Sequence, residues 1–284
     1  MLAAAAGDRI PRLTIPAPRL RRFQTTFQRE KSMQKLKDRV AIITGGAQGI
    51  GAAYARAMAA EGACVAIADI LDGTSLARDI EADGGRAMAV QVNVADEKSV
   101  LAMAEAVNEH FGRIDILVNN AAVYASLQLK PFSDIDVAEW DKVMAVNVRG
   151  PFVCAKAVVP FMRGNGYGRI VNISSGTPFK GTPNLLHYVT SKGAILALTR
   201  ALAREVGGDG ICVNTLAPGL VLSEGVIQNT DMRERLTGPV LASRAIKRDQ
   251  TPEDLIEPLL FLASDACAFM TGETLVVDGG SVMH

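Results

Sequence analysis

The sequence predicts an α/β protein: one domain built on a doubly wound parallel sheet of about seven strands, flanked by helices. Three observations point to this fold class. Short apolar runs alternate with helix-forming stretches, the loops between them are short, and polar residues gather just after the apolar runs. The chain has 284 residues, of which 49% are hydrophobic, so it can bury a core of this size.

Seven apolar runs have the length and composition of buried parallel strands. They lie at residues 40–44, 64–69, 87–92, 114–119, 169–174, 211–216 and 274–277. Helices are expected from the turn after the first run to about residue 61, then at 73–83, 97–111, 137–161, 187–206 and 254–264. The long helix should break near Gly150-Pro151. Residues 220–250 are polar and irregular with short helical stretches, and 220–245 is the expected lid over a binding site.

The polar residues that follow the predicted strands should share one edge of the sheet. Right-handed crossovers bring the carboxyl ends of parallel strands together, and ligands bind outside those ends. The residues concerned are Thr44, Asp69, Asn93, Asn119, Asn120, Ser174, Ser175, Pro218 and Gly219. A random distribution of surface residues would not place all of them there.

Composition excludes several classes of function. The formal net charge is zero, so no global basic field would attract nucleic acid. No apolar run approaches the length of a membrane span, and no membrane partner is expected. The four cysteines are far apart, in mostly apolar segments and without metal-ligand spacing. We therefore expect buried thiols in a reducing compartment, a cytoplasmic location and no metal site.

The first 32 residues differ from the rest of the chain. They carry seven basic residues, two acidic ones and three prolines. The segment could be an Arg-rich organelle transit peptide, or untranslated sequence read from an upstream start, because Met33 opens what looks like a complete domain. We expect residues 1–34 to be a disordered or non-native extension and residues 35–284 to form the domain.

A glycine-rich turn follows the first strand, with Gly45, Gly49 and Gly51 in Gly-x-x-x-Gly-x-Gly spacing. A bare backbone before a helix N-terminus lets a pyrophosphate approach the first-turn N–H groups. Gln48 and Ile50 lie in the same turn and are expected to contact the ligand. The spacing differs from the common Gly-x-Gly-x-x-Gly dinucleotide fingerprint, and a tight turn without ligand is the alternative.

Asp69 ends the second strand, where a carboxylate can accept hydrogen bonds from both ribose hydroxyls of adenosine. It would repel a 2′-phosphate, and no neighbouring arginine is present to bind one, so NAD is favoured over NADP. The alternative is that Asp69 is a solvated turn residue. Asn93 and Val94 could cover the adenine, although Asn93 could be a plain turn residue. Asn120 is expected near the ribose, whereas Asn119 could equally tie strands together.

Tyr188 and Lys192 lie one helical turn apart on one helix face. A phenol has a pKa of about 10, which a nearby ammonium should lower. Tyr188 could then take the proton of an alcohol while a nicotinamide takes the hydride. Tyr-x-x-x-Lys alone occurs by chance on many helices. Ser175, 13 residues earlier, could bond the substrate oxygen, and Asn147 suggests a helix kink or a bound water near the lysine.

This constellation resembles the short-chain dehydrogenase/reductase family, the branch of about 250 residues, from about residue 35 to 284. The resemblance implies a Rossmann-type fold, a homotetramer formed through helices at about 150–161 and 188–206, and a catalytic tetrad. In the tetrad, Tyr188 is the acid/base, Ser175 orients the substrate, Lys192 binds the nicotinamide ribose and Asn147 holds a relay water. The nicotinamide end is expected against Pro218, Gly219, Val221 and Ser223. Ala122 and Ser223 replace the family's usual glycine and threonine, and both changes should be tolerated.

The expected walls of the substrate pocket are mostly apolar, which favours an apolar or ring-bearing secondary alcohol over a sugar. They are Pro178, Phe179, Leu185, Leu186, Val123 and Tyr124. His187 is expected to be a packing or surface residue. Residues 181–184 and 222–226 are loosely similar to branches that act on aryl carbinols or pyridoxal. The alternatives are an NADP-dependent 3-oxoacyl-[acyl-carrier-protein] reductase and a non-catalytic NAD-binding scaffold, which would be expected to lose Tyr188 or Lys192.

Overall fold

The computed structural model describes residues 34–283, so the expectations for the N-terminal extension lie outside the described residues. Seven parallel strands form one sheet in the order β3-β2-β1-β4-β5-β6-β7. The strands are β1 Val40–Thr44, β2 Cys64–Asp69, β3 Arg86–Gln91, β4 Ile116–Asn119, β5 Gly168–Ile173, β6 Ile211–Pro218 and β7 Thr274–Val277. The predicted fold class is confirmed, and the strand order reverses direction between β1 and β4, where doubly wound sheets bind their ligands.

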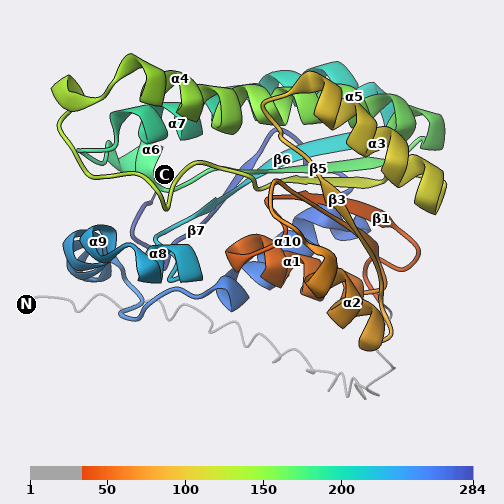
Figure 1. Ribbon diagram of the computed structural model, residues 1–284, viewed down its shortest axis with the longest axis horizontal. Coiled ribbons are helices and arrows are strands. Elements are labelled where there is room, and N and C mark those ends of the chain that lie inside the picture. Colours follow the sequence, from red (N-terminus) through yellow and green to blue (C-terminus); the bar gives the residue numbers. More distant parts are fainter. Residues whose placement is uncertain (1–33, 284) are drawn as a thin grey trace, which may run out of the picture. The chain divides into compact units, whose positions relative to one another are not determined.

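Helices cover both faces of the sheet (Figure 1). The α-helices are α1 Gly49–Ala60, α2 Thr74–Ala82, α3 Glu97–Phe111, α4 Val137–Met144, α5 Gly150–Asn165, α6 Thr177–Lys180, α7 Leu186–Val206, α8 Glu224–Gln228, α9 Thr230–Ser243 and α10 Ile256–Ala263. Short 3₁₀ turns lie at Phe132–Asp134, Gly207–Asp209, Pro252–Leu255 and Asp265–Cys267.

The core has two halves, one on each side of the sheet. Successive strand residues point to opposite faces, so Ile43 packs with α1, α2 and α10, whereas Ile42 packs with α3, α5 and α7. Because both faces are covered, the strands are apolar throughout rather than alternating. Cys64, Cys154, Cys212 and Cys267 are all buried and free, as the sequence predicts.

The long predicted helix at 137–161 is interrupted, five residues earlier than expected. Residues Ala145–Arg149 form a π-helical turn between α4 and α5, and α5 starts at Gly150 with Pro151 in its first turn. Proline has no N–H to continue the α-helical hydrogen bonds, and the π-turn stands just before it. The π-turn contains Asn147, the residue for which the sequence predicts a kink.

One expectation about membranes needs correction. The continuous helical stretch Val137–Asn165 has 29 residues, and an 18-residue window within it has a mean hydropathy of 1.2, which is long and apolar enough to span a bilayer by length and composition. In the fold, 56% of its most apolar window is buried, and α5 packs against α3, β4 and β5. Its apolar character is therefore used in the core of the domain.

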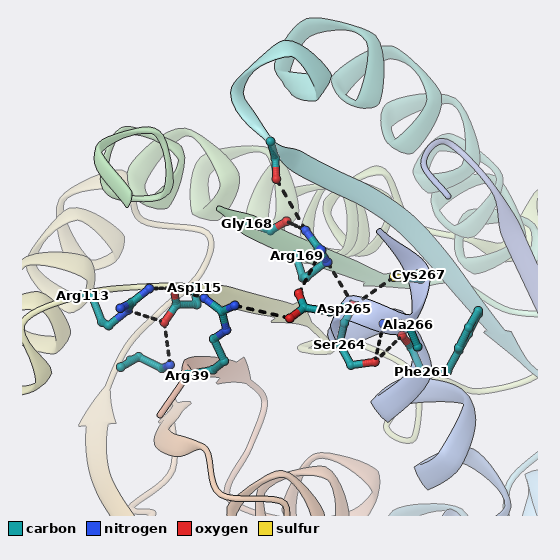
Figure 2. A network of polar contacts seen from close by, with 12 residues as sticks. Arg39, Arg113, Asp115, Gly168, Arg169, Phe261, Ser264, Asp265, Ala266 and Cys267 are labelled. Atoms are coloured by element: carbon teal, nitrogen blue, oxygen red, sulfur yellow. Dashed lines mark hydrogen bonds and ion pairs between the residues drawn. The ribbon is translucent and has the colours of Figure 1, made fainter. Parts of the chain in front are cut away.

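A polar network pins the amino ends of β1, β4 and β5 (Figure 2). The fully buried Asp115 accepts hydrogen bonds from the Val40 backbone N–H at 2.9 Å and from Arg113 Nε at 2.7 Å, and Arg39 lies 3.6 Å away. Asp265 pairs with both Arg39 and Arg169, at 3.6 and 3.3 Å. This network stands at the sheet edge opposite the predicted site, so it holds the strands without occupying their carboxyl ends.

Candidate active site

The glycine turn after β1 has a backbone that other residues could not adopt without strain. Gly45 and Gly49 have φ values of +63° and +55°. A Cβ on Gly45 would lie 2.8 Å from Ala121 Cα, and one on Gly51 would lie 2.0 Å from the Gly45 carbonyl oxygen. The turn is therefore closely packed on its inner side, which brings the start of α1 up to the sheet edge.

The N-terminus of α1 has open hydrogen-bond donors. Its N-cap residue, Gln48, makes no side-chain capping bond and the first turn carries no acidic residue. By contrast, α3 is capped by Asp96, whose carboxylate accepts from the Lys98 N–H at 3.0 Å. Uncapped N–H groups at a helix N-terminus attract an anion, so this turn fits a pyrophosphate.

Asn120 and Thr44 hold the turn in place. Asn120 Nδ2 donates to the carbonyl oxygens of Thr44 and Gly45, both at 3.0 Å. Thr44 Oγ1 accepts from the N–H groups of Asn120 and Ala121, both at 3.1 Å. The predicted ligand contact Asn120 is thus also a positioning residue of the glycine turn.

Asp69 lies at the carboxyl end of β2, where the sequence places it, and it already has two backbone partners. Its carboxylate accepts from the Ala47 N–H and the Leu71 N–H, both at 3.0 Å. A carboxylate has about four lone-pair sites, so acceptor capacity remains for a ribose. Asn93 Oδ1 accepts from the Ala95 N–H at 3.0 Å, which is the turn role given above as its alternative.

A cleft of about 710 Å³ joins the predicted cofactor residues at this edge. Its volume lies in the range of small-molecule and cofactor sites. The predicted residues that line it are Gly45, Gln48, Gly49, Ile50, Gly51, Asp69, Asn93, Val94, Asn120 and Ser223. Dinucleotide chemistry fits this donor and acceptor set.

A second, smaller cavity of about 170 Å³ adjoins the cleft, and Ile50, Asn120, Ala122 and Ser223 line both. The predicted residues that line it, besides these, are Ser175, Tyr188, Lys192, Pro218, Gly219 and Val221. Three of the four proposed catalytic residues therefore face one cavity at the end of the cleft.

Tyr188 is buried, and its ring lies 4.5 Å from the ring of Tyr124, centroid to centroid. Loss of water raises the pKa of Tyr188; the Tyr124 phenol adds to that rise, and a hydrogen bond with Ser175 opposes it. This differs from the expected lowering by Lys192, whose Nζ is 5.7 Å from the Tyr188 ring centroid. Burial outweighs the ammonium because water solvates a phenolate far better than the apolar cavity does.

Lys192 is buried on α7, and its Nζ donates to the Ile173 carbonyl oxygen at 2.8 Å. Burial lowers the pKa of Lys192 to about 8. A second contact fixes its backbone, since Ser174 Oγ donates to the Lys192 carbonyl oxygen at 2.8 Å. The ammonium is thus tied to the end of β5 next to Ser175.

Asn147 does not line either cavity but supports their walls from behind. Its Oδ1 accepts from the Val123 N–H at 2.8 Å, and its Nδ2 donates to the Val123 carbonyl oxygen at 3.2 Å and to Ser191 Oγ at 3.1 Å. The π-turn gives the amide this position between the loop after β4 and α7. Asn147, the fourth proposed catalytic residue, therefore connects the loop after β4 to the helix that carries Tyr188 and Lys192.

Asn119 has the structural role given above as one of two possibilities, which is to tie neighbouring strands together. Its Nδ2 donates to Asn172 Oδ1 at 2.8 Å, and Asn172 in turn donates to Thr199 Oγ1 at 2.9 Å. The chain of side chains ties β4 to β5 and to α7. His187 is likewise a packing residue, fully buried with Nε2 3.1 Å from Glu139 Oε1.

The predicted walls of the substrate pocket are right in part. Leu185 and Tyr124 line the smaller cavity and Val123 lines the cleft, but Pro178, Phe179 and Leu186 line neither. Pro178 instead faces α7, and Leu186 is exposed. The expected lid at 220–245 supplies Leu220, Val226, Leu236 and Val240, and the stretch 181–184 supplies Thr182. Sequence reasoning did not name the other lining residues, and no local pattern links the C-terminal segment to the site: they are Ile173, Gly176, Thr177, Lys180, Asp278 and Ser281.

A family model described as enoyl-(acyl carrier protein) reductase matches residues 45–282. The short-chain reductase protein NovJ of Streptomyces niveus is 39% identical over 253 residues, covering 86% of this chain and 94% of that protein. The 3-oxoacyl-[acyl-carrier-protein] reductase of Synechocystis is 36% identical, covering 88% and 100%. Cis-4-hydroxycyclohexanecarboxylate dehydrogenase of Sinomonas cyclohexanicum is 38% identical, covering 86% and 96%.

A solved structure is also similar. It is a candidate NAD(P)-dependent gluconate 5-dehydrogenase from Beutenbergia cavernae with NADP bound at low occupancy. The TM-score is 0.80 at 36% identity, covering 88% of this chain and 98% of that one.

Proposed function

The chain belongs to the short-chain dehydrogenase/reductase family, whose members similar to it are oxidoreductases acting on CH–OH groups, and we propose that it uses NAD to interconvert a ring-bearing secondary alcohol and its ketone. The observation that carries the proposal is the junction of two cavities. The small cavity with Ser175, Tyr188 and Lys192 opens beside the larger cleft with the glycine turn and Asp69.

The proposed chemistry assigns one task to each side chain. The Ser175 hydroxyl holds the substrate oxygen beside Tyr188, which takes the alcohol proton as the phenolate in oxidation and donates a proton as the phenol in reduction. Lys192 places a positive charge next to Tyr188, and Asn147 keeps the helix and loop in register. NAD bound in the adjoining cleft would supply the acceptor for the hydride of the carbinol carbon and the positive charge of an oxidised nicotinamide ring. The glycine turn, Asp69 and Asn120 would hold it.

The size of the small cavity favours a compact substrate. Its volume is about 170 Å³. A cavity of about 150 Å³ in another protein holds one benzene molecule. One six-membered ring with a small substituent fits such a space.

The NAD preference rests on Asp69, whose carboxylate lines the cleft and is 8% exposed. A 2′-phosphate at this position would meet like charge in a poorly hydrated place. Of the residues lining the cleft, the one cationic side chain is Lys142 of α4. Because the related Beutenbergia cavernae structure contains NADP, the cofactor needs a direct test.

Replacing Asp69 by Ala should raise kcat/KM for NADP⁺ relative to NAD⁺ by at least about tenfold, the size expected for removing one unfavourable charge contact. The variant should also lose some stability, because Asp69 holds the Ala47 and Leu71 N–H groups. Asp72→Ala is the matched control, since Asp72 caps Thr74 outside the cleft and should leave the ratio unchanged. Steady-state kinetics with both cofactors measure the ratio, and wild type that prefers NADP⁺ would contradict the assignment.

A substrate panel tests the proposed reaction as a whole. Absorbance of NADH should report turnover of cyclohexanol, cyclopentanol, aryl carbinols or their ketones by the purified protein. Faster NADPH-dependent reduction of acetoacetyl thioesters would identify a 3-oxoacyl reductase instead. No turnover with any alcohol, ketone, pyridoxal or thioester, despite measurable NADH binding, would favour the non-catalytic scaffold.

We also propose a cytoplasmic homotetramer. A groove of about 840 Å³ on α4, α5 and α7 includes Phe152, which is 54% exposed although large and apolar. Such surfaces are typical of protein contacts. The four buried free thiols suit a reducing compartment. Light scattering would refute the assembly if it gave the 30.1 kDa mass of one chain, and organelle localisation of tagged protein would refute the location.

A further inference from the structure

The small cavity has a cationic corner that the apolar walls do not explain. Lys180, the last residue of α6, lines the cavity together with Ser281 and Thr182. Its Nζ donates to Ser243 Oγ at 3.2 Å and also to Ser281 Oγ. An ammonium has three donors, and these hydroxyls use two. No further acceptor for Nζ stands among residues 34–283, and Lys180 is an exposed residue, so its third N–H is open to solvent and to a ligand.

The charges around this corner sum to positive. The charged residues that line the cavity are Lys180, Lys192 and Asp278, which leaves one ammonium in excess. Asp278 is buried and is not within ion-pair distance of Lys180, and its Oδ1 accepts from the Ser281 N–H at 2.9 Å. Loss of water is the largest influence on the pKa of Lys180 and lowers it, so part of this ammonium is removed from solvent. The Asp278 carboxylate raises the pKa of Lys180, and the Arg244 guanidinium lowers it by a smaller effect.

The position of Lys180 is fixed relative to Ser175. The one-turn helix α6 begins at Thr177, whose N–H donates to Ser175 Oγ at 3.2 Å, and it ends at Lys180. The same short segment therefore carries the group that would hold the alcohol oxygen and a cation at a set distance from it. A substrate bound at both ends would present one defined carbon to Tyr188.

We propose that the substrate carries a carboxylate besides its alcohol, and that Lys180, helped by the hydroxyl of Thr182, binds this carboxylate. The inference rests on the proposed function and narrows its substrate class from ring alcohols in general to anionic ring alcohols, that is, hydroxy acids and their keto acids. Charge-assisted hydrogen bonds supply both the affinity and the selectivity. Lys180 is a specificity-determining residue in this scheme and takes no part in the proton or hydride transfer.

Matched substrates with and without the charge test the proposal. The probes are cis-4-hydroxycyclohexanecarboxylate, its methyl ester and cyclohexanol. Wild type should prefer the acid. Lys180→Met should lower kcat/KM for the acid by about 10- to 100-fold, mostly through KM, the range for a hydrogen bond to a charged group. The ester and cyclohexanol should change by less than about threefold, since neither offers a carboxylate to the ammonium.

Two further variants separate charge from structure. Lys180→Arg keeps the cation and should keep the preference for the acid. Lys247→Met removes an exposed lysine whose Nζ bonds the Ala242 carbonyl oxygen outside the cavity, and it should behave as wild type. An acid-to-ester ratio that Lys180→Met leaves unchanged would overturn the proposal, as would a wild type that prefers the ester.

The same experiments distinguish failure of the carboxylate site from failure of the proposed alcohol dehydrogenase function. Turnover of cyclohexanol and ester without preference for the acid would reject the carboxylate site and keep the alcohol dehydrogenase. If no ring alcohol reacts, the proposed function fails, and calorimetry with 4-oxocyclohexanecarboxylate and its methyl ester in the presence of NADH decides the site. Tighter binding of the acid by wild type but not by Lys180→Met would support it, and equal binding of acid and ester would reject it.

Discussion

Replacing Tyr188 by Phe should lower kcat by roughly 10²–10⁴-fold, the range for loss of a general acid/base. The change removes only the hydroxyl, so the buried ring keeps its packing against Tyr124. NADH binding, followed by protein or cofactor fluorescence, should stay within about threefold of wild type, because Tyr188 does not line the larger cleft. The loss should therefore appear in kcat and not in cofactor affinity.

Tyr124→Phe is the matched control for this experiment. Tyr124 is a second phenol in the same cavity, and burial raises its pKa to about 12. If the proton passes through Tyr188 alone, the Tyr124 variant should keep kcat within about tenfold of wild type. A Tyr188→Phe enzyme with near-normal kcat, or equal losses in the two variants, would reject the assignment of the acid/base.

Replacing Lys192 by Met should lower kcat by roughly 10²-fold or more, the size seen when one preorganised charged or polar group is lost from an active site. Without the ammonium, a phenolate at Tyr188 would form in a cavity where burial already opposes it. Methionine has a similar length, so α7 should pack as before. A variant that retains most of the wild-type kcat would show that Lys192 does not assist Tyr188.

The same variant has a predicted effect on stability that depends on pH. The pKa of Lys192 is about 8 in the fold against 10.5 for the ordinary side chain, so between these values the unfolded chain holds more protons. Stability of the wild type therefore rises with pH across this window, and the cost of burying the ammonium is fully present only below about pH 8. Relative to Lys192→Met, wild type should gain up to ~3 kcal/mol between pH 8 and 10.5.

Denaturant unfolding of both proteins at several pH values measures this difference. Comparing the two proteins cancels the titration of groups that lie far from Lys192. Tyr188 stays protonated in both folded proteins over this window, because burial raises its pKa. A difference in unfolding free energy that stays constant from pH 7.5 to 10 would mean that Lys192 is not held in a poorly hydrated place.

The sequence was sufficient to predict the sheet and the edge of the sheet that carries the site, because both depend on local patterns. Apolar runs mark the strands, and a polar residue after a strand must lie at the carboxyl edge whatever the tertiary details are. The residues Ser175, Tyr188 and Lys192 meet in one cavity as expected. Here a spacing of four residues on one helix and a position after a strand already set the geometry.

The sequence predicts the lid at 220–245 as a segment, but the packing of its helix α9 and the cationic corner depend on contacts between distant parts of the chain, which local patterns do not show. Helix α9 is polar and contains Pro239, yet it forms 14 residues because Met232 is buried beneath it and Asn229 caps it. Asn229 is itself held by the carbonyl oxygens of Ala125 and Leu127, about a hundred residues earlier. Lys180 likewise meets Ser281 across 101 residues of sequence.

The prediction that Lys192 lowers the pKa of Tyr188 was wrong for a related reason. The spacing to Lys192 is visible in the sequence, but the depth of burial that outweighs the ammonium is not. Burial is a property of the assembled cavity, to which Tyr124 and the segments after β5 and β6 all contribute. Sequence spacing can therefore propose a catalytic pair but cannot assign its acidity.

The arginine–aspartate network around Asp115 and Asp265 has a consequence for engineering. It clamps β1, β4 and β5 where they begin, and Asp115 and Arg169 are almost completely shielded from solvent. Salt screens such buried contacts little. The scaffold is thus anchored on the side remote from the cavities, so residues 177–186 and 220–245 could be exchanged to retarget the enzyme while the frame that aligns its reacting groups stays intact.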